Sequence, residues 1–154
     1  MHIAGLDTDI IDALTQVATA EHRPDALTIG VSLPDASDEL PGCIADLDAL
    51  LETELARVSP RVLVAVVHAA GRLTEGRAFA SELIDRASVH SSNSLGRDLT
   101  AIGVVLDDEH DRALAARRIA EHLGGRSNLG DGTVVTARDL RRSTLRDLIL
   151  EDVL

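Results

Sequence analysis

The chain contains three apolar segments in which hydrophobic residues follow one another without polar alternation. They are ALTIGVSL at 26–33, RVLVAVVH at 61–68 and LTAIGVVL at 99–106. A strand with one solvated face alternates apolar and polar side chains, whereas a strand covered on both faces is apolar throughout. We therefore predict that these segments are the central strands of a largely parallel sheet with helices on both sides.

Apolar residues at helical spacing occupy the stretches between these strands. The predicted helices cover residues 8–20, 43–58, 74–88, 108–123 and 138–154. Residues 2–6 and 133–137 are weaker strand candidates, and the serine-rich segment 88–98 is expected to be a polar loop. This alternation predicts one three-layer α/β domain over residues 1–154, with a largely parallel sheet of four to five strands and about five helices.

The charge balance disfavours nucleic acid as a partner. The chain has 26 acidic and 15 basic residues, all of the latter arginine, and a formal net charge of −11. Such a chain repels phosphate backbones at long range. Phe79 is its one aromatic residue, so the stacking platforms that bind unpaired bases are missing as well.

Cysteine usage and hydropathy indicate a cytoplasmic protein. Cys43 is the only cysteine, which rules out an intrachain disulfide and fits a reducing compartment. The longest uncharged apolar run, VLVAVV at 62–67, is far too short to span a bilayer. We therefore expect no membrane association.

The acidic segment DDEHD at 107–111 follows the third central strand directly. Its ordinary interpretation is the start of a helix, where carboxylates accept bonds from free N–H groups and meet the positive end of the helix dipole. A chemical role is the alternative, because ligands of open α/β folds bind beyond the carboxyl ends of the strands. Carboxylates from separate strands could hold a hydrated Mg²⁺ that activates water for phosphoester cleavage.

The candidates for that chemistry lie where the predicted strands end. His68 could act as a general base, and Asp107 is a second candidate for catalysis. The candidate metal ligands are Asp7, Asp9, Asp108 and Asp111.

Two segments resemble parts of the PIN-domain ribonucleases. HIAGLDTDIIDAL at 2–14 is similar to their opening strand, aspartate and helix, and DGTVVTARDL at 131–140 is similar to a strand-and-acid segment near their C-terminal end. The resemblance implies that Asp7 is the first metal carboxylate and Asp111 a later one, with Asp139 as a further candidate and Glu39 in the place of the middle acid. It implies Mg²⁺-dependent cleavage of RNA.

The C-terminal helix offers a different function, because its apolar residues cover more than one side. An excess of apolar surface favours a contact with another molecule, such as a symmetric dimer. The alternative is a terminal helix wedged between two elements of its own domain. The residues predicted to form the interface are Leu145, Leu148, Ile149, Leu150, Val153 and Leu154.

Two functions follow from these observations. We expect a small non-catalytic domain that acts through protein association, as a homo-oligomer or with a partner protein, and that needs no cofactor. The alternative is a Mg²⁺-dependent phosphoesterase or ribonuclease of PIN-like type that uses the strand-end carboxylates.

Overall fold

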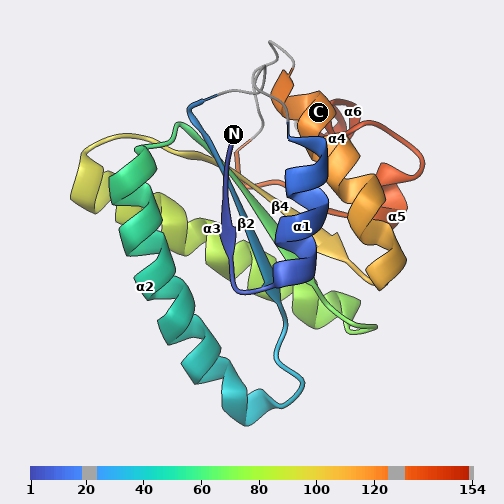
Figure 1. Ribbon diagram of the computed structural model, residues 1–154, viewed down its shortest axis with the longest axis horizontal. Helices are drawn as coiled ribbons and strands as arrows, with labels where there is room; N and C mark the ends of the chain where they lie inside the picture. Colours follow the sequence, from blue (N-terminus) through green and yellow to red (C-terminus); the bar gives the residue numbers. More distant parts are fainter. Residues whose placement is uncertain (19–23, 125–130, 153–154) are drawn as a thin grey trace.

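The computed structural model describes residues 1–18, 24–124 and 131–152. Its five strands form one parallel sheet in the order β1-β2-β3-β4-β5, so each strand pairs with its neighbour in sequence (Figure 1). The strands are β1 (His2–Gly5), β2 (Ala26–Ser32), β3 (Val62–His68), β4 (Thr100–Leu106) and β5 (Val134–Thr136). The predicted parallel α/β sheet is confirmed.

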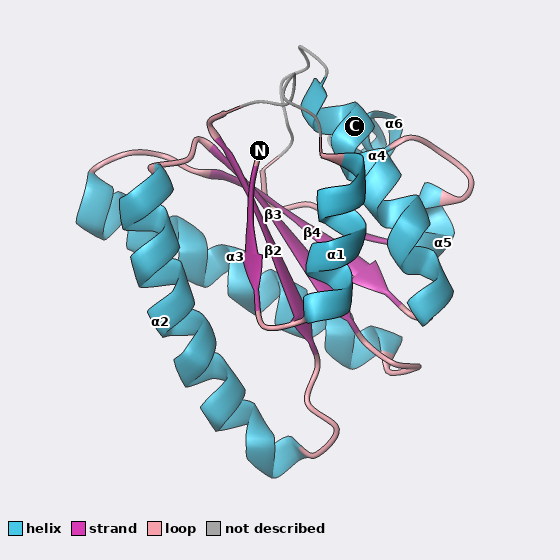
Figure 2. Ribbon diagram, in the orientation of Figure 1, coloured by secondary structure: helices cyan, strands magenta, loops and turns pink. Residues whose placement is uncertain are grey.

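Six helices lie within the described residues, together with two 3₁₀ turns (Figure 2). The helices are α1 (Thr8–Val17), α2 (Leu40–Val58), α3 (Leu73–Leu95), α4 (Arg112–Gly124), α5 (Ala137–Leu140) and α6 (Leu145–Asp152). The 3₁₀ turns are η1 (Ser37–Glu39) and η2 (Glu109–Asp111). Among these elements, no helix combines the length and the apolar character that crossing a lipid bilayer requires.

Helices cover the sheet on both sides, which explains why the central strands are apolar throughout. Along β3, Leu63, Ala65 and Val67 face α2 and α3, whereas Val62, Val64 and Val66 face the layer of α1 and α4. All six are buried, the most accessible being Val62 at 3%. Helices α5 and α6 add to the second layer through Leu140, Leu145 and Ile149.

The connections between strands do not all have the same hand. Each connection steps to the next strand in one direction across a parallel sheet. Helices α1 and α4 nevertheless lie on one face, and α2 and α3 on the other. When the direction from strand to strand is constant, a connection over one face of the sheet has the opposite hand to a connection over the other face. Two of the four connections must therefore be left-handed. About 98% of such connections are right-handed, because strand twist favours that path.

The serine-rich segment predicted as a loop belongs instead to helix α3, which continues to Leu95. Two features of Ser91 account for the extension: the residue is buried, and its hydroxyl donates to the Arg97 carbonyl at 3.1 Å. The helix then ends at Gly96, whose φ of 61° closes the last turn. Serine lowers helix propensity only slightly, and here a buried turn outweighs it.

The single C-terminal helix predicted over 138–154 is two helices. Thr136 and Asp139 form a capping box at the start of α5, with the Thr136 N–H donating to Asp139 at 2.9 Å. Thr144 and Asp147 repeat the pattern at α6, where the Thr144 hydroxyl donates to Asp147 at 2.7 Å. Two T-x-x-D boxes eight residues apart start two helices, and the chain bends between them.

Two helical glycines form a matched pair for a test of packing. A Cβ at Gly76 would lie 2.5 Å from the Ala69 Cβ, whereas a Cβ at Gly42 would meet nothing within 4 Å. We expect Gly76→Ala to lower the free energy of unfolding by about 1–2 kcal/mol through overpacking. Gly42→Ala should raise it by about 0.5–1 kcal/mol through helix propensity. Urea denaturation of both variants measures this, and equal effects would contradict the packing described.

Candidate functional site

The change of helix layer defines two crevices at the carboxyl edge of the sheet. The chain leaves β1 towards the α1–α4 layer and β2 towards the α2–α3 layer, so the first crevice lies between β1 and β2. It leaves β3 towards the α2–α3 layer and β4 towards the α1–α4 layer, so the second crevice lies between β3 and β4. Ligands of open α/β sheets bind where neighbouring connections diverge in this way. Three of the predicted site residues, Asp7, His68 and Asp107, lie at the ends of strands that border these crevices.

Asp7 closes the crevice between β1 and β2. Its carboxylate accepts the N–H of Ile10 at 3.0 Å, which caps α1, and it accepts a short hydrogen bond from the Ser32 hydroxyl at the end of β2. Burial is the largest influence on the pKa of Asp7 and raises it. The two hydrogen bonds and the charge of Arg112 outweigh burial and leave that pKa below its ordinary value.

Asp9 lies on the first turn of α1 and faces α4. Its carboxylate lies 3.3 Å from Nη1 of Arg112, and the same nitrogen lies 3.9 Å from Glu109. The candidate ligand Asp9 is therefore joined to the start of α4 and does not line the second crevice.

The turn that follows β3 borders the second crevice, and its backbone has an uncommon conformation. Ala70 and Gly71 have φ of 48° and 83°. Alanine rarely adopts the left-handed region, and such strain is often found at functional sites. The turn is tied to the end of β4, because the Gly71 N–H donates to the Asp107 carbonyl at 3.2 Å. His68 ends β3 at this edge and is half-buried.

A cavity of about 330 Å³ lies next to that turn, and we call it the carboxyl-edge cavity. Two arginines face three of the predicted acids across it. The residues that line it are Leu73, Asp107, Asp108, Asp111, Thr136, Ala137, Arg138 and Arg141.

Two of the three acids that line this cavity already bind other groups of the protein. Asp108 caps η2 by accepting the His110 N–H at 2.9 Å, and this bond is the largest influence that lowers the pKa of Asp108. Asp111 is buried and makes a short ion pair with Arg141. Asp107 is exposed and has no ion-pair partner among the described residues. The acidic segment therefore does begin a helix, and it also lines a cavity.

The four candidate metal ligands do not gather in one place. Asp7 is bound to Ser32 at the first crevice, Asp9 pairs with Arg112 at the start of α4, and Asp108 and Asp111 line the carboxyl-edge cavity. Over the described ranges, no group of three or more histidine, cysteine, aspartate or glutamate side chains is arranged to hold a metal ion. Of the other two acids in the PIN-like comparison, Asp139 is bound in its capping box and Glu39 is exposed on η1.

Two of the six residues predicted to form an interface on the C-terminal helix are buried within the chain itself. Leu145 and Ile149 are buried at 1% and 3% exposure, and Leu148 is half-buried against the same core. Leu150 remains 53% exposed. Val153 and Leu154 lie outside the described residues. Among the described residues of α6, Leu150 is the apolar side chain that remains exposed.

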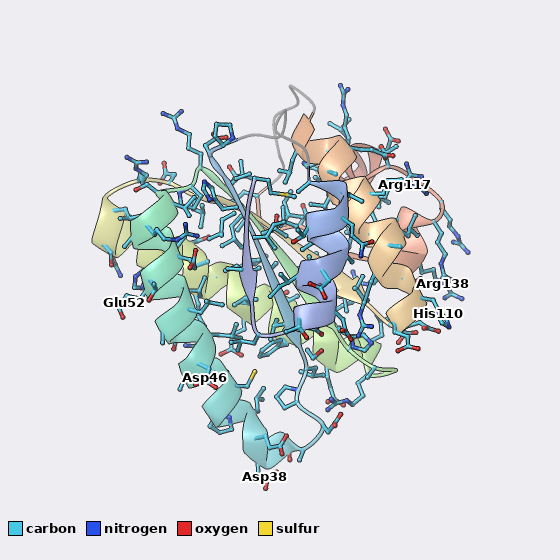
Figure 3. All side chains as sticks on the ribbon, in the orientation of Figure 1. Asp38, Asp46, Glu52, His110, Arg117 and Arg138 are labelled. Carbon is cyan, nitrogen blue, oxygen red and sulfur yellow. The ribbon has the colours of Figure 1, made fainter. Side chains whose placement is uncertain are left out.

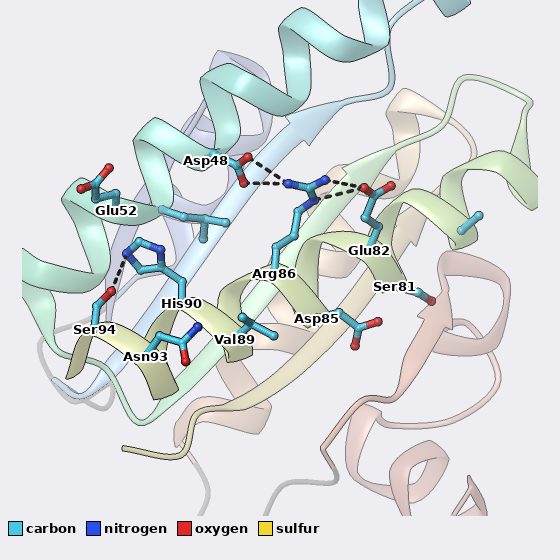
Figure 4. A pocket seen from close by; sticks show the side chains of 12 residues that line it. Asp48, Glu52, Ser81, Glu82, Asp85, Arg86, Val89, His90, Asn93 and Ser94 are labelled. Carbon is cyan, nitrogen blue, oxygen red and sulfur yellow. Dashed lines mark hydrogen bonds and ion pairs between the residues drawn. The ribbon is translucent and has the colours of Figure 1, made fainter. Parts of the chain in front are cut away.

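A larger hollow lies between α2 and α3 (Figure 4), and we call it the α2–α3 groove. Its volume is about 950 Å³, against about 330 Å³ for the carboxyl-edge cavity. Val89 lies in this groove and is 59% exposed, the most of the three exposed large hydrophobic residues described. Leu51 and Ala78 add further apolar lining.

Charged residues surround the apolar lining of the groove. Arg86 on α3 bridges both walls, donating to Asp48 of α2 at 2.9 Å and to Glu82 at 2.9 Å (Figure 4). Glu52 and Asp85 also line the groove and form no ion pair with any described residue. Four acids against one arginine give the groove a negative balance.

Sequence reasoning missed this groove because it ended the third helix at residue 88. Continuing the helix places Val89 outside the buried stripe of Phe79, Leu83 and Ala87, and so predicts an exposed valine. The sequence signal was therefore present, but the serines around it favoured a loop.

Comparison of the chain with protein-family models, with curated proteins and with solved structures gives no match. The similarity to PIN-domain ribonucleases is thus confined to the two short segments. Any functional conclusion must come from the surfaces described above.

The hydrogen bonds of Asp7 predict a defined pH dependence of stability. Because its pKa is lower in the folded state, its stabilisation is complete above about pH 4 and is lost as the pH falls through the folded-state value. Asp7→Asn should cost about 1 kcal/mol at neutral pH, because hydrogen bonds to a charged acceptor become neutral ones, and the difference from wild type should shrink in acid. Urea denaturation between about pH 7 and pH 2 measures this. Asp12→Asn, on the exposed side of α1, is the control and should show no such difference.

Proposed function

We propose that this chain is a non-catalytic, cytoplasmic association domain that binds a partner protein through the α2–α3 groove. The exposure of Val89 inside a groove of about 950 Å³ is the observation that carries the proposal. An apolar side chain in a concave, polar-rimmed surface is typical of a docking site.

Two further features of the groove support docking. Both walls are helices that pack on the same face of the sheet, so the groove is held by the core and needs little ordering on binding. Arg86 of α3 reaches across the groove to Asp48 of α2, and Glu82 on the same helix as Arg86 holds the guanidinium in place. A preformed apolar groove with charged rims suits a protein segment better than a small reactive substrate.

Association of two copies of the chain is the other form of this function, and α6 is the surface it would use. Leu150 is the exposed apolar residue of that helix. The same experiment separates the two surfaces, because Val89 and Leu150 are similarly exposed and lie on different helices.

The test is a selection of helical peptides from a displayed library on the wild-type protein. We expect the selected peptides to lose at least about tenfold in affinity for Val89→Asp, since a charge would replace the apolar centre of the site. Their affinity for Leu150→Asp should be unchanged. Isothermal calorimetry measures both. Failure to select any binder, or loss in Leu150→Asp alone, would overturn the groove as the docking site.

A second candidate function is supported by the carboxyl-edge cavity. Asp107, Asp108 and Asp111 meet Arg138 and Arg141 there, beside a strained turn at a crevice of the sheet. Arginines suit phosphate oxygens, and Mg²⁺ in such sites is bound by one or two carboxylates together with the phosphates of the substrate. His68 lies at the same edge and would be the base candidate.

Thermal unfolding in the presence of Mg²⁺ and inorganic phosphate tests this second function. A site in the cavity should raise the Tm of the wild type by mass action and lose that increase in Asp108→Asn. Asp38→Asn removes the same charge from the exposed η1 turn and should keep the increase. The phosphoesterase fails if neither ligand shifts the Tm, or if all three proteins respond equally.

A further inference from the structure

We infer that the segment docking in the α2–α3 groove is a basic amphipathic helix of a partner protein. This inference rests on the proposed function and adds the chemistry of the partner. It follows from the shape of the groove and from the charges along its rim.

The shape fits a helix, because the groove runs between two helices. Among the residues that line it, Ala78 and Val89 are exposed and apolar, whereas Leu51 is buried at 1% exposure. Side chains of a third helix at i, i+3 and i+7 would fit such a surface, as in other helix-in-groove complexes. An extended strand would need an unpaired sheet edge, and the walls here are helical.

The charged residues along the rim of the groove indicate that the partner segment is positively charged. Arg86 is already saturated by Asp48 and Glu82, as the dashed contacts of Figure 4 show. Glu52 and Asp85 have no ion-pair partner among the described residues. Arginine or lysine flanking an apolar stripe would pair with both, whereas an acidic helix would place like charges together.

A second copy of this chain does not fit the same groove. The chain carries a net charge of −11, so copies repel one another at long range. Figure 3 shows Asp46 and Glu52 along α2 and Asp38 on η1 just before it, with Arg117 and Arg138 on the opposite side of the view. The C-terminal segment offers no basic helix, because Arg138, Arg141, Arg142 and Arg146 are matched by four acids between 137 and 152.

The test uses two designed helical peptides of about five turns with the same leucine stripe. One carries arginine beside the stripe, and the other carries glutamate at the same positions. We expect the arginine peptide to bind in a fluorescence anisotropy titration, to weaken as salt rises, and the glutamate peptide to remain unbound.

Matched variants assign that binding to the groove. Glu52→Gln/Asp85→Asn should weaken the arginine peptide about three- to tenfold, and Val89→Asp should weaken it at least tenfold. Asp12→Asn/Asp35→Asn removes the same charge from exposed positions elsewhere and should leave binding unchanged. Equal weakening in both double variants would show long-range attraction only and would overturn the inference.

The two proposals can fail separately. If the library yields peptides that need Val89 but carry no basic residues, the association function stands and the basic helix is wrong. If no peptide binds at the groove, the proposed function itself is wrong. Binding of the glutamate peptide as strongly as the arginine peptide would also overturn the charge argument.

Discussion

Exclusion of water from both faces of the central strands is the constraint on which the rest of the structure depends. Strands β2, β3 and β4 carry apolar side chains on both of their faces, so neither face of the sheet can be left in contact with water. Two helical layers are therefore needed. With strands added in sequence order, helices on both faces require connections of both hands. The crevices at the carboxyl edge are a direct result of that arrangement.

The same constraint explains how much of the fold could be predicted. The apolar runs at 26–33, 61–68 and 99–106 correspond to β2, β3 and β4 within a residue or two. The order of the strands could not be predicted, because it depends on which helix packs on which face and periodicity does not report this. Local chemistry misled the prediction at α3, where a buried Ser91 keeps the helix intact, and at α6, where Thr144 starts a new helix.

The candidate site was predictable in part. Sequence position placed Asp107 and Asp108 at one strand end, and the resemblance to PIN-domain ribonucleases added Asp111. The three do line one cavity. The partners of the candidate acids were not predictable from the sequence. Arg141, which pairs with Asp111, is 30 residues away along the chain, and Ser32, which donates to Asp7, is 25 residues away. The α2–α3 groove was missed for another reason. It lies between two helices whose packing against each other cannot be predicted from periodicity. Its exposed apolar residue, Val89, lies on a helical turn that the neighbouring serines made us predict as a loop.

The sequential order of the strands has a consequence for synthesis of the chain. Every strand pairs with the one made just before it, from β1 at one edge to β5 at the other. No strand has to wait for a distant segment before it finds its hydrogen-bond partners, so contacts remain local for a parallel sheet. The nascent protein can thus add one β-α unit after another as it emerges from the ribosome, with the growing edge always at the newest strand.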